Sequence, residues 1–269
     1  MSDVLNTIRD FAPVQGRHPD ARTWQGYLVE AKVAASAALK PRNTGVTKFL
    51  IMARARSGTT LLTDLLGAHP NVTCDREVLA KKVMDPRRFL NTLARKSTSK
   101  AYGAKLLSYQ MVLVQDFRDP KAFLSTLQND GFKLIHLSRD TFAQTVSLTR
   151  AQASQYYHST TKNSTTSAVI DPEEFLRRLT WNAKLAEYEA ACLQDLNHLA
   201  LRYEDDLSNE DQQETTANRV FDFLDLPHAS VSTRLKKVLP TDPKLALQNY
   251  AEISAKVTEA QLGHLLPIT

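Results

Sequence analysis

The chain has only two cysteines, Cys74 and Cys192, among its 269 residues. So few thiols provide neither a disulfide framework nor a cysteine-rich metal site, and we expect no bound metal. Glycine and proline are also scarce, at eight and eleven residues, which excludes a fibrous or low-complexity protein. The hydrophobic share of 42% is, by contrast, enough for a sizeable core. The length fits one α/β domain, or one domain with a small appendage.

Long apolar runs are missing as well. No stretch approaches the roughly 18 consecutive apolar residues that a membrane-spanning helix needs. Residues 1–41 lack the apolar centre of a signal peptide. We therefore expect a cytoplasmic protein with no transmembrane segment.

Basic residues outnumber acidic ones by 34 to 29, and the formal net charge is +5. This balance indicates anionic ligands without naming them. The basic residues cluster between positions 81 and 100, but no aromatic residues alternate with them as on a surface that binds single-stranded nucleic acid. We interpret the cluster as a solvated helical face and expect no nucleic-acid partner. Its members are Lys81, Lys82, Arg87, Arg88, Arg95, Lys96 and Lys100.

From about residue 47 onward, strand and helix patterns alternate. Such alternation predicts an α/β fold with a parallel sheet and helices on both faces, and ligands beyond the carboxyl ends of the strands. We divide the chain into a helical N-terminal extension, residues 1–45, and a P-loop-like α/β domain, residues 46–269. The predicted strands are 49–53, 102–108, 132–137 and 199–203, and the predicted helices are 59–68, 120–127, 141–154, 171–193 and 217–226.

The most informative segment is the turn Arg56-Ser-Gly-Thr-Thr60, between a buried strand and a helix. It holds one glycine, three hydroxyl side chains and one fixed positive charge. Backbone N–H groups and the start of a helix meet at this turn, an arrangement that binds anions. The segment therefore predicts a phosphate- or sulfate-binding loop.

The loop differs from the phosphate loop of nucleotide kinases, G-x-x-x-x-G-K-[ST]. Met52 or Ala53 stands at the first glycine position, and Thr59 stands where lysine is required. These departures count against ATP chemistry. Two alternatives stay open: a P-loop kinase or nucleotide hydrolase with an atypical loop, and a non-catalytic protein that binds a partner through the basic face near Arg87 and Arg95.

The loop resembles the 5′-phosphosulfate loop of the sulfotransferases that use 3′-phosphoadenosine 5′-phosphosulfate (PAPS). Its continuation to His69-Pro-Asn-Val72 is similar to tyrosylprotein sulfotransferases and to bacterial carbohydrate sulfotransferases of the nodulation-factor type. The resemblance implies that PAPS is the co-substrate and 3′-phosphoadenosine 5′-phosphate (PAP) the product, with no metal. It also implies that the 5′ end of the nucleotide is bound by Arg56, Ser57, Gly58, Thr59 and Thr60.

Further motifs support the resemblance. In the family, an arginine that ends a strand and a serine eight residues later hold the 3′-phosphate, which implies this role for Arg139 and Ser147. Residues 199–207 resemble the family's strand that ends in Tyr-Glu-Asp, so Tyr203 is a candidate cofactor contact, with packing at the strand end as the alternative. Residues 244–253 are similar to a C-terminal segment of bacterial members. Leu61 replaces the tryptophan of steroid- and phenol-sulfating enzymes, which favours the bacterial carbohydrate-like branch.

The resemblance also supplies candidate catalytic residues. Glu77 stands where family members place a glutamate, and we expect it to take the proton of the acceptor hydroxyl; a surface ion pair with Arg76 or Lys81 is the alternative. Arg56 is the candidate that stabilises the departing phosphate. Lys105 assists at the transferred group or forms a structural salt bridge. We expect a hydroxylated acceptor, a carbohydrate or glycolipid, bound by residues 78–100 and 154–172.

Overall fold

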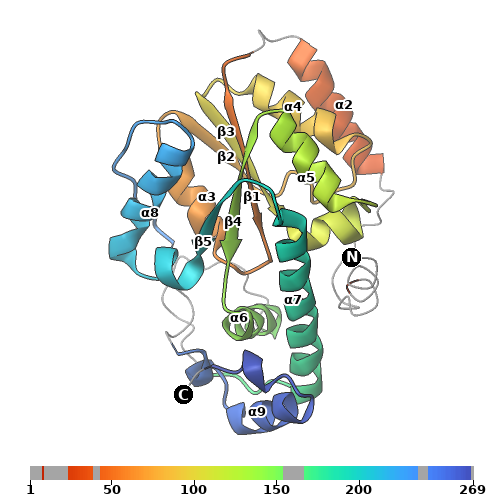
Figure 1. Ribbon diagram of the computed structural model, residues 1–269, viewed down its shortest axis with the longest axis vertical. Coiled ribbons are helices and arrows are strands. Elements are labelled where there is room, and N and C mark those ends of the chain that lie inside the picture. The colour runs from red at the N-terminus through yellow and green to blue at the C-terminus, as the bar shows by residue number, and fades with distance from the viewer. Residues whose placement is uncertain (1–7, 9–23, 39–42, 154–166, 236–241, 268–269) are drawn as a thin grey trace.

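The computed structural model describes residues 8, 24–38, 43–153, 167–235 and 242–267. Five strands form one sheet in the order β2-β3-β1-β4-β5, and every pairing is parallel. The predicted α/β fold with a parallel sheet is therefore confirmed (Figure 1). The strands are β1 (Thr47–Ala53), β2 (Val72–Asp75), β3 (Ala101–Leu107), β4 (Phe132–Ser138) and β5 (His198–Arg202).

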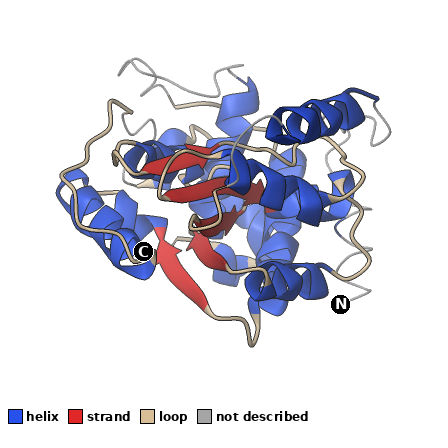
Figure 2. Ribbon diagram, turned by 90° about the horizontal axis from the view of Figure 1, so that it is seen from above, coloured by secondary structure: helices blue, strands red, loops and turns tan. Residues whose placement is uncertain are grey.

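Helices cover both faces of the sheet, as Figure 2 shows from above. The helices α3 and α8 contribute to one buried apolar cluster, and α4, α5 and α7 contribute to another on the opposite face. None of the helices in the described ranges is both long and apolar enough to cross a membrane. Their bounds are α2 (Trp24–Ala38), α3 (Thr59–Gly67), α4 (Pro86–Lys96), α5 (Pro120–Asn129), α6 (Thr141–Ala153), α7 (Pro172–Leu193), α8 (Glu210–Phe223) and α9 (Tyr250–Glu259).

The central strand β1 is buried on both faces. Phe49 and Ile51 belong to the cluster with α3 and α8, whereas Leu50 and Met52 belong to the cluster with α4, α5 and α7. This division follows the two-residue period of a strand. Because both faces are packed, the end of β1 at Ala53 is fixed, and so is the origin of the loop that follows.

A third apolar cluster lies beyond the carboxyl edge of the sheet, where α6, α7 and α9 pack together (Figure 1). The Asn249 side chain joins this layer to residues 168–170, because its Oδ1 accepts from the N–H of Ile170 at 3.1 Å and its Nδ2 donates to the Ile170 carbonyl at 2.8 Å. The end of the segment 154–172 is therefore anchored. Residues 154–166 lie outside the described residues.

The N-terminal part packs on the main domain through α2. This helix lies against α4, and Gly26 approaches the chain so closely that a Cβ there would lie 2.0 Å from the Lys82 carbonyl oxygen. Ile8 is also buried, and its carbonyl accepts a hydrogen bond from Trp181 Nε1 at 3.1 Å. An N-terminal helix is thus confirmed, while the division of the chain at residue 45 stays a prediction.

Candidate active site

The loop after β1 has an unusual backbone that depends on glycine. Arg56 has φ = 66° and Gly58 has φ = 92°, both in the left-handed region. A Cβ on Gly58 would lie 2.5 Å from Cδ2 of the Tyr203 ring, so no larger residue fits there. The helix α3 begins at Thr59 without a side-chain cap. Its first N–H groups therefore have no intrahelical or side-chain acceptor, which is the condition for binding an anion.

The structure brings Arg56, Arg139 and Ser147 together. Arg139 follows β4, which pairs with β1, and its Nη1 donates to the Arg56 carbonyl oxygen at 2.8 Å. Arg56 Nε in turn donates to Ser147 Oγ on α6 at 3.2 Å. The two predicted anion sites, one at each strand-to-helix junction, therefore lie side by side at the carboxyl edge of the sheet.

Tyr203 lies beside these residues, at the start of the π-helical turn η2 (Tyr203–Leu207) after β5. The Arg139 guanidinium lies 4.3 Å from the centre of the Tyr203 ring, within cation–π range. Burial raises the pKa of Tyr203, and the charge of Arg139 partly opposes this rise. The ring thus orients Arg139 and closes the space above Gly58, in agreement with the packing interpretation of this residue.

Two polar atoms of the site lack partners among the described residues. Ser57 Oγ and Arg139 Nε are buried and make no hydrogen bond. Buried polar groups are rarely left unsatisfied, because the loss of water is costly. The nearest acid to Arg139 is Glu204, at 3.9 Å, which is too long for a hydrogen bond. Unsatisfied donors beside a cation are suited to the oxygens of a phosphate or sulfate group.

Glu77 and Lys105 come from the two strands beyond β1: Glu77 follows β2, and Lys105 lies on β3, which pairs with β1. Lys105, on β3, places its Nζ 3.0 Å from Glu77 Oε1 and donates to Thr60 Oγ1 at 3.4 Å. Gln110 Nε2 holds the second carboxylate oxygen of Glu77 at 2.9 Å. The Glu77 side chain is still 32% exposed, so an acceptor hydroxyl has access to it. The salt bridge considered for Lys105 is therefore present, and it fixes Glu77 next to the start of α3.

In the part of the chain that the structure describes, neither Arg76 nor Lys81 pairs with Glu77. Among the described residues, Lys81 Nζ donates to Gln25 Oε1 at 3.1 Å instead. His69 is not a candidate base, because both ring nitrogens are engaged. Its Nδ1 accepts from the Asn71 N–H at 3.0 Å, and its Nε2 therefore carries the proton that the Pro227 carbonyl accepts at 3.0 Å.

Arg54, which no sequence motif marks as a site residue, directly follows β1 and is only 3% exposed. Its Nη2 donates to the Arg139 carbonyl at 2.6 Å and its Nη1 to Thr141 Oγ1 at 3.0 Å. Its Nε lies 3.5 Å from Glu189, and burial lowers the pKa of Arg54 while the Glu189 carboxylate raises it. Gln144 Nε2 also connects α6 to the loop after β1, because it donates a hydrogen bond to the Ala55 carbonyl at 2.6 Å. These side chains fix both loops of the site relative to each other.

Groups of three or more His, Cys, Asp or Glu side chains that would hold a metal ion are not found in the described part of the chain. Asp140, which follows β4 and Arg139, caps α6. Its Oδ1 accepts from the Ala143 N–H at 2.8 Å.

An all-parallel sheet with an uncapped helix and two neighbouring arginines at its carboxyl edge defines a P-loop-like α/β protein, with a candidate anion site at that edge. The sequence model of the sulfotransferase domain matches residues 46–259. Because this match spans most of the chain, the protein belongs to the sulfotransferase family and is a PAPS-dependent sulfotransferase. The family assignment decides against the kinase and hydrolase alternative.

Solved structures with a similar fold are also sulfotransferases. One is a sulfotransferase from Alicyclobacillus acidocaldarius, with 11% identity, a TM-score of 0.48, and coverage of 81% of this chain and 95% of that one. Another is the sulfotransferase domain of the Synechococcus PCC 7002 olefin synthase, with 14% identity, a TM-score of 0.42, and coverage of 86% and 98%. Mouse sulfotransferase SULT7A1 complexed with PAP has 13% identity, a TM-score of 0.47, and coverage of 88% of both chains. A search of curated protein sequences gives no match.

Proposed function

We propose that this enzyme transfers a sulfuryl group from PAPS to a hydroxyl of a carbohydrate or glycolipid. The site assignment rests on two hydrogen bonds: Arg139 donates to the Arg56 carbonyl, and the Arg56 side chain donates to Ser147. These contacts support one nucleotide that reaches both junctions. The 5′ end would lie at Arg56 and the N–H groups of residues 57–60, and the 3′-phosphate at Arg139 and Ser147.

The unsatisfied atoms fit such a ligand. Ser57 Oγ and Arg139 Nε would each gain an anionic acceptor, and charge-assisted hydrogen bonds of this kind are among the stronger ones in proteins. Arg56 holds Ser147 in the free protein. We therefore expect its side chain to turn toward the 5′ end when the nucleotide binds and to release the Ser147 hydroxyl for the 3′-phosphate.

PAPS supplies an activated sulfuryl group on the 5′-phosphate. Glu77 is placed to take the proton of the acceptor hydroxyl while the acceptor oxygen bonds to sulfur and the bond from sulfur to the phosphate oxygen breaks. The positive charge of Arg56 and the N–H groups at the start of α3 stabilise the charge that develops on the phosphate. Lys105 holds Glu77 and lies against Thr60, so it connects the proton acceptor to the loop.

The carbohydrate or glycolipid acceptor rests on the resemblance to bacterial carbohydrate sulfotransferases. Residues 78–100 and 154–172 are the segments proposed to bind it. The helix α4 lies at the amino edge of the sheet, because Asn91 on α4 contacts Lys48 near the start of β1. Of residues 78–100, those that directly follow Glu77 are the remaining candidates on that side, and the Ala80 N–H donates to the Glu77 carbonyl at 3.2 Å.

The test is calorimetric titration of PAP into the wild type and three variants. We expect Arg56→Ala and Arg139→Ala to weaken binding by about tenfold to a hundredfold, since a hydrogen bond to a charged group contributes about 1.5–3 kcal/mol. Glu77→Gln should bind PAP normally and fail to transfer sulfate to an acceptor. Arg118→Ala is the control, because Arg118 is exposed and lies outside the site.

Equal PAP affinity in all variants would contradict the assigned nucleotide site. Normal turnover of Glu77→Gln would contradict the assigned base. The acceptor is tested separately, by incubating the wild type with labelled PAPS and a panel of free sugars, glycolipids, phenols and steroids. Sulfation of phenols or steroids but not of sugars would reject the carbohydrate proposal and leave the sulfotransferase assignment intact.

A further inference from the structure

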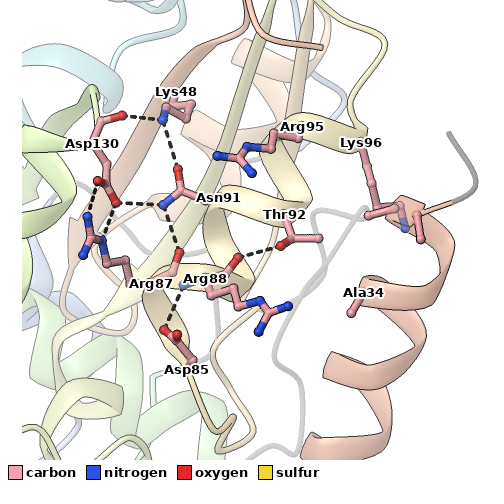
Figure 3. Close-up of a pocket in the computed structure, with 12 residues that line it drawn as sticks. Ala34, Lys48, Asp85, Arg87, Arg88, Asn91, Thr92, Arg95, Lys96 and Asp130 are labelled. Carbon is pink, nitrogen blue, oxygen red and sulfur yellow. Dashed lines mark hydrogen bonds and ion pairs between the residues drawn. The ribbon is translucent and has the colours of Figure 1, made fainter. Parts of the chain in front are cut away.

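A second cationic site lies at the amino edge of the sheet, opposite the loop of Arg56. It is a cavity of about 580 Å³ between α2 and α4, with Lys48 from β1 at its base (Figure 3). Typical small-molecule pockets measure about 300–1,000 Å³. The strand β1 separates the two sites, and seven strand residues span about 20 Å. The cavity is thus not part of the candidate active site.

The cavity carries an excess of positive charge. Five of its twelve lining residues are Lys or Arg and two are Asp. Both acids are already engaged: Asp130 accepts two hydrogen bonds from Arg87, at 2.7 and 2.6 Å, and Asp85 caps α4 by accepting from the Arg88 N–H at 2.9 Å. Asp130 therefore offsets the charge of Arg87, whereas the backbone N–H leaves the charge of Asp85 in place, and the lining as a whole stays positively charged.

Two arginines stand out among them. Arg88 and Arg95 are exposed, and neither guanidinium makes a hydrogen bond or ion pair with any part of the chain that the structure describes. Burial lowers the pKa of Lys48, and the nearby charge of Arg95 lowers it further, against the opposing effect of Asp130. Like charges that face one cavity repel each other in the free protein, and a bound anion would relieve this repulsion.

The two arginines are spaced along the cavity. They lie seven residues, or two helical turns, apart on α4, a rise of about 10 Å. In Figure 3 the Arg95 guanidinium points toward Lys48 and Asn91, whereas the Arg88 guanidinium points toward α2. The guanidinium groups of Arg88 and Arg95 therefore face two different parts of the cavity.

The wall opposite α4 is apolar. Ala34 and Ala38 are one helical turn apart on α2, with Ala37 beside them, and their methyl groups offer no hydrogen bonds. Such a wall suits the carbon skeleton of an organic molecule better than it suits an inorganic ion. We propose that this cavity binds a small organic molecule with two anionic groups, phosphate or sulfate, one held by Arg88 and the other by Arg95 with Lys48; we call this ligand the dianion after its two anionic groups.

The test is calorimetry with PAP present at saturation, so that the candidate active site is filled. The two probes are fructose 1,6-bisphosphate and naphthalene-1,5-disulfonate, which distinguish a phosphate site from a sulfo-group site. We expect one of them to bind with one molecule per chain, and fructose 6-phosphate, with a single phosphate, to bind at least tenfold more weakly than the bisphosphate. The substitutions Arg88→Gln and Arg95→Gln should each weaken dianion binding at least tenfold.

The matched control is the double variant Lys32→Gln/Arg118→Gln. Both residues are exposed and lie outside the cavity, and Lys32 is on α2 itself. This variant should bind the dianion as the wild type does. PAP affinity should stay unchanged in all these proteins, which separates this proposal from the proposed function.

Several results would overturn the proposal. These are no binding of either probe to the wild type, equal dianion binding in the Arg88→Gln and Arg95→Gln variants, or equally tight binding of fructose 6-phosphate. Dianion binding that disappears when PAP is added would place the ligand at the active site instead. A loss of PAP affinity in the Arg88→Gln and Arg95→Gln variants would show a general effect on the fold and would also count against the cavity.

Discussion

Arg139 Nη1 donates a hydrogen bond to the backbone carbonyl oxygen of Arg56 at 2.8 Å. This contact ties the end of β4 to the loop after β1, so a shift of either loop moves the other. The same guanidinium lies over the Tyr203 ring. The orientation of Arg139 is therefore fixed before any ligand binds, which reduces the cost of ordering the site.

The first prediction concerns the planar shape of this guanidinium. Arg139→Lys keeps the charge but loses the planar group that stacks on Tyr203 and contacts the loop carbonyl at the same time. We expect PAP affinity to fall by about tenfold to a hundredfold, which corresponds to about 1.4–2.7 kcal/mol. Calorimetry provides the measurement.

The matched control for this change is Arg202→Lys. Arg202 also ends a strand of the same sheet, but its side chain is 56% exposed and pairs with Glu204 and Asp205 at the surface. Its PAP affinity should match the wild type. If both variants bind PAP equally well, the planar contact of Arg139 has no role in the site.

The second prediction concerns Gly58. Its φ of 92° disfavours alanine by about 1–2 kcal/mol, and the added methyl would also press on the Tyr203 ring. Gly58→Ala should therefore lower the free energy of unfolding in urea and weaken PAP binding, since the loop must shift. Gly67→Ala is the control, because Gly67 ends α3 and a Cβ there would meet no atom within 4 Å. The Gly67→Ala variant should have the same free energy of unfolding as the wild type or a slightly higher one. Equal free energies of unfolding for Gly58→Ala and Gly67→Ala would refute the steric argument.

The third prediction concerns the buried pair of Arg54 and Glu189, which are 3% and 1% exposed. Arg54→Met leaves the Glu189 carboxylate buried, with His136 and Ser108 as its remaining neighbours. Removing one partner of such a pair costs about 3–5 kcal/mol. The double variant Arg54→Met/Glu189→Leu should lose less stability than the sum of the two single changes. If the double variant loses as much free energy of unfolding in urea as the two single variants together, the two side chains do not stabilise each other.

Much of the fold was predictable because its signals are local. The strands β1, β3 and β4 are apolar runs, and α5 and α7 begin with an aspartate followed by proline. Both aspartates cap their helices: Asp119 accepts from the Ala122 N–H and Asp171 from the Glu174 N–H, each at 2.9 Å. The strand β2 was missed because only four residues form it and only Val72 among them is buried. The helix α8 begins at Glu210, before the predicted residue 217, because Asn209 caps it.

The candidate site was predictable to the extent that a motif marks it. Arg56, Arg139 and Ser147 were named as candidates because the two arginines follow strands and Ser147 lies eight residues after Arg139, a spacing typical of the family, and the structure brings the three side by side. Arg54 and Gln110 were not found, because their roles depend on contacts between distant segments. Arg54 acts through the carbonyl of Arg139, and Gln110 through Glu77, and no short sequence pattern predicts such contacts.

The last prediction concerns the pH dependence of stability near the second cavity. Hydrogen bonds from Arg87 and Asn91 lower the pKa of Asp130 to about 2, against the opposing effect of burial. An aspartate in the unfolded chain titrates near pH 4. Because the pKa is lower in the folded state, the ionised Asp130 stabilises the protein fully above about pH 4, and this contribution is lost as the pH falls toward 2.

Asp130→Asn should therefore be less stable than the wild type at neutral pH. We expect a difference of about 1 kcal/mol or less, since Arg87 is 55% exposed and the ion pair is screened by water. The difference should shrink between pH 4 and pH 2, as followed by urea unfolding at each pH. Arg87→Gln removes the main cause of the lowered pKa and should show the same convergence with the wild type. A difference between wild type and Asp130→Asn that stays constant down to pH 2 would mean that this ion pair does not stabilise the fold.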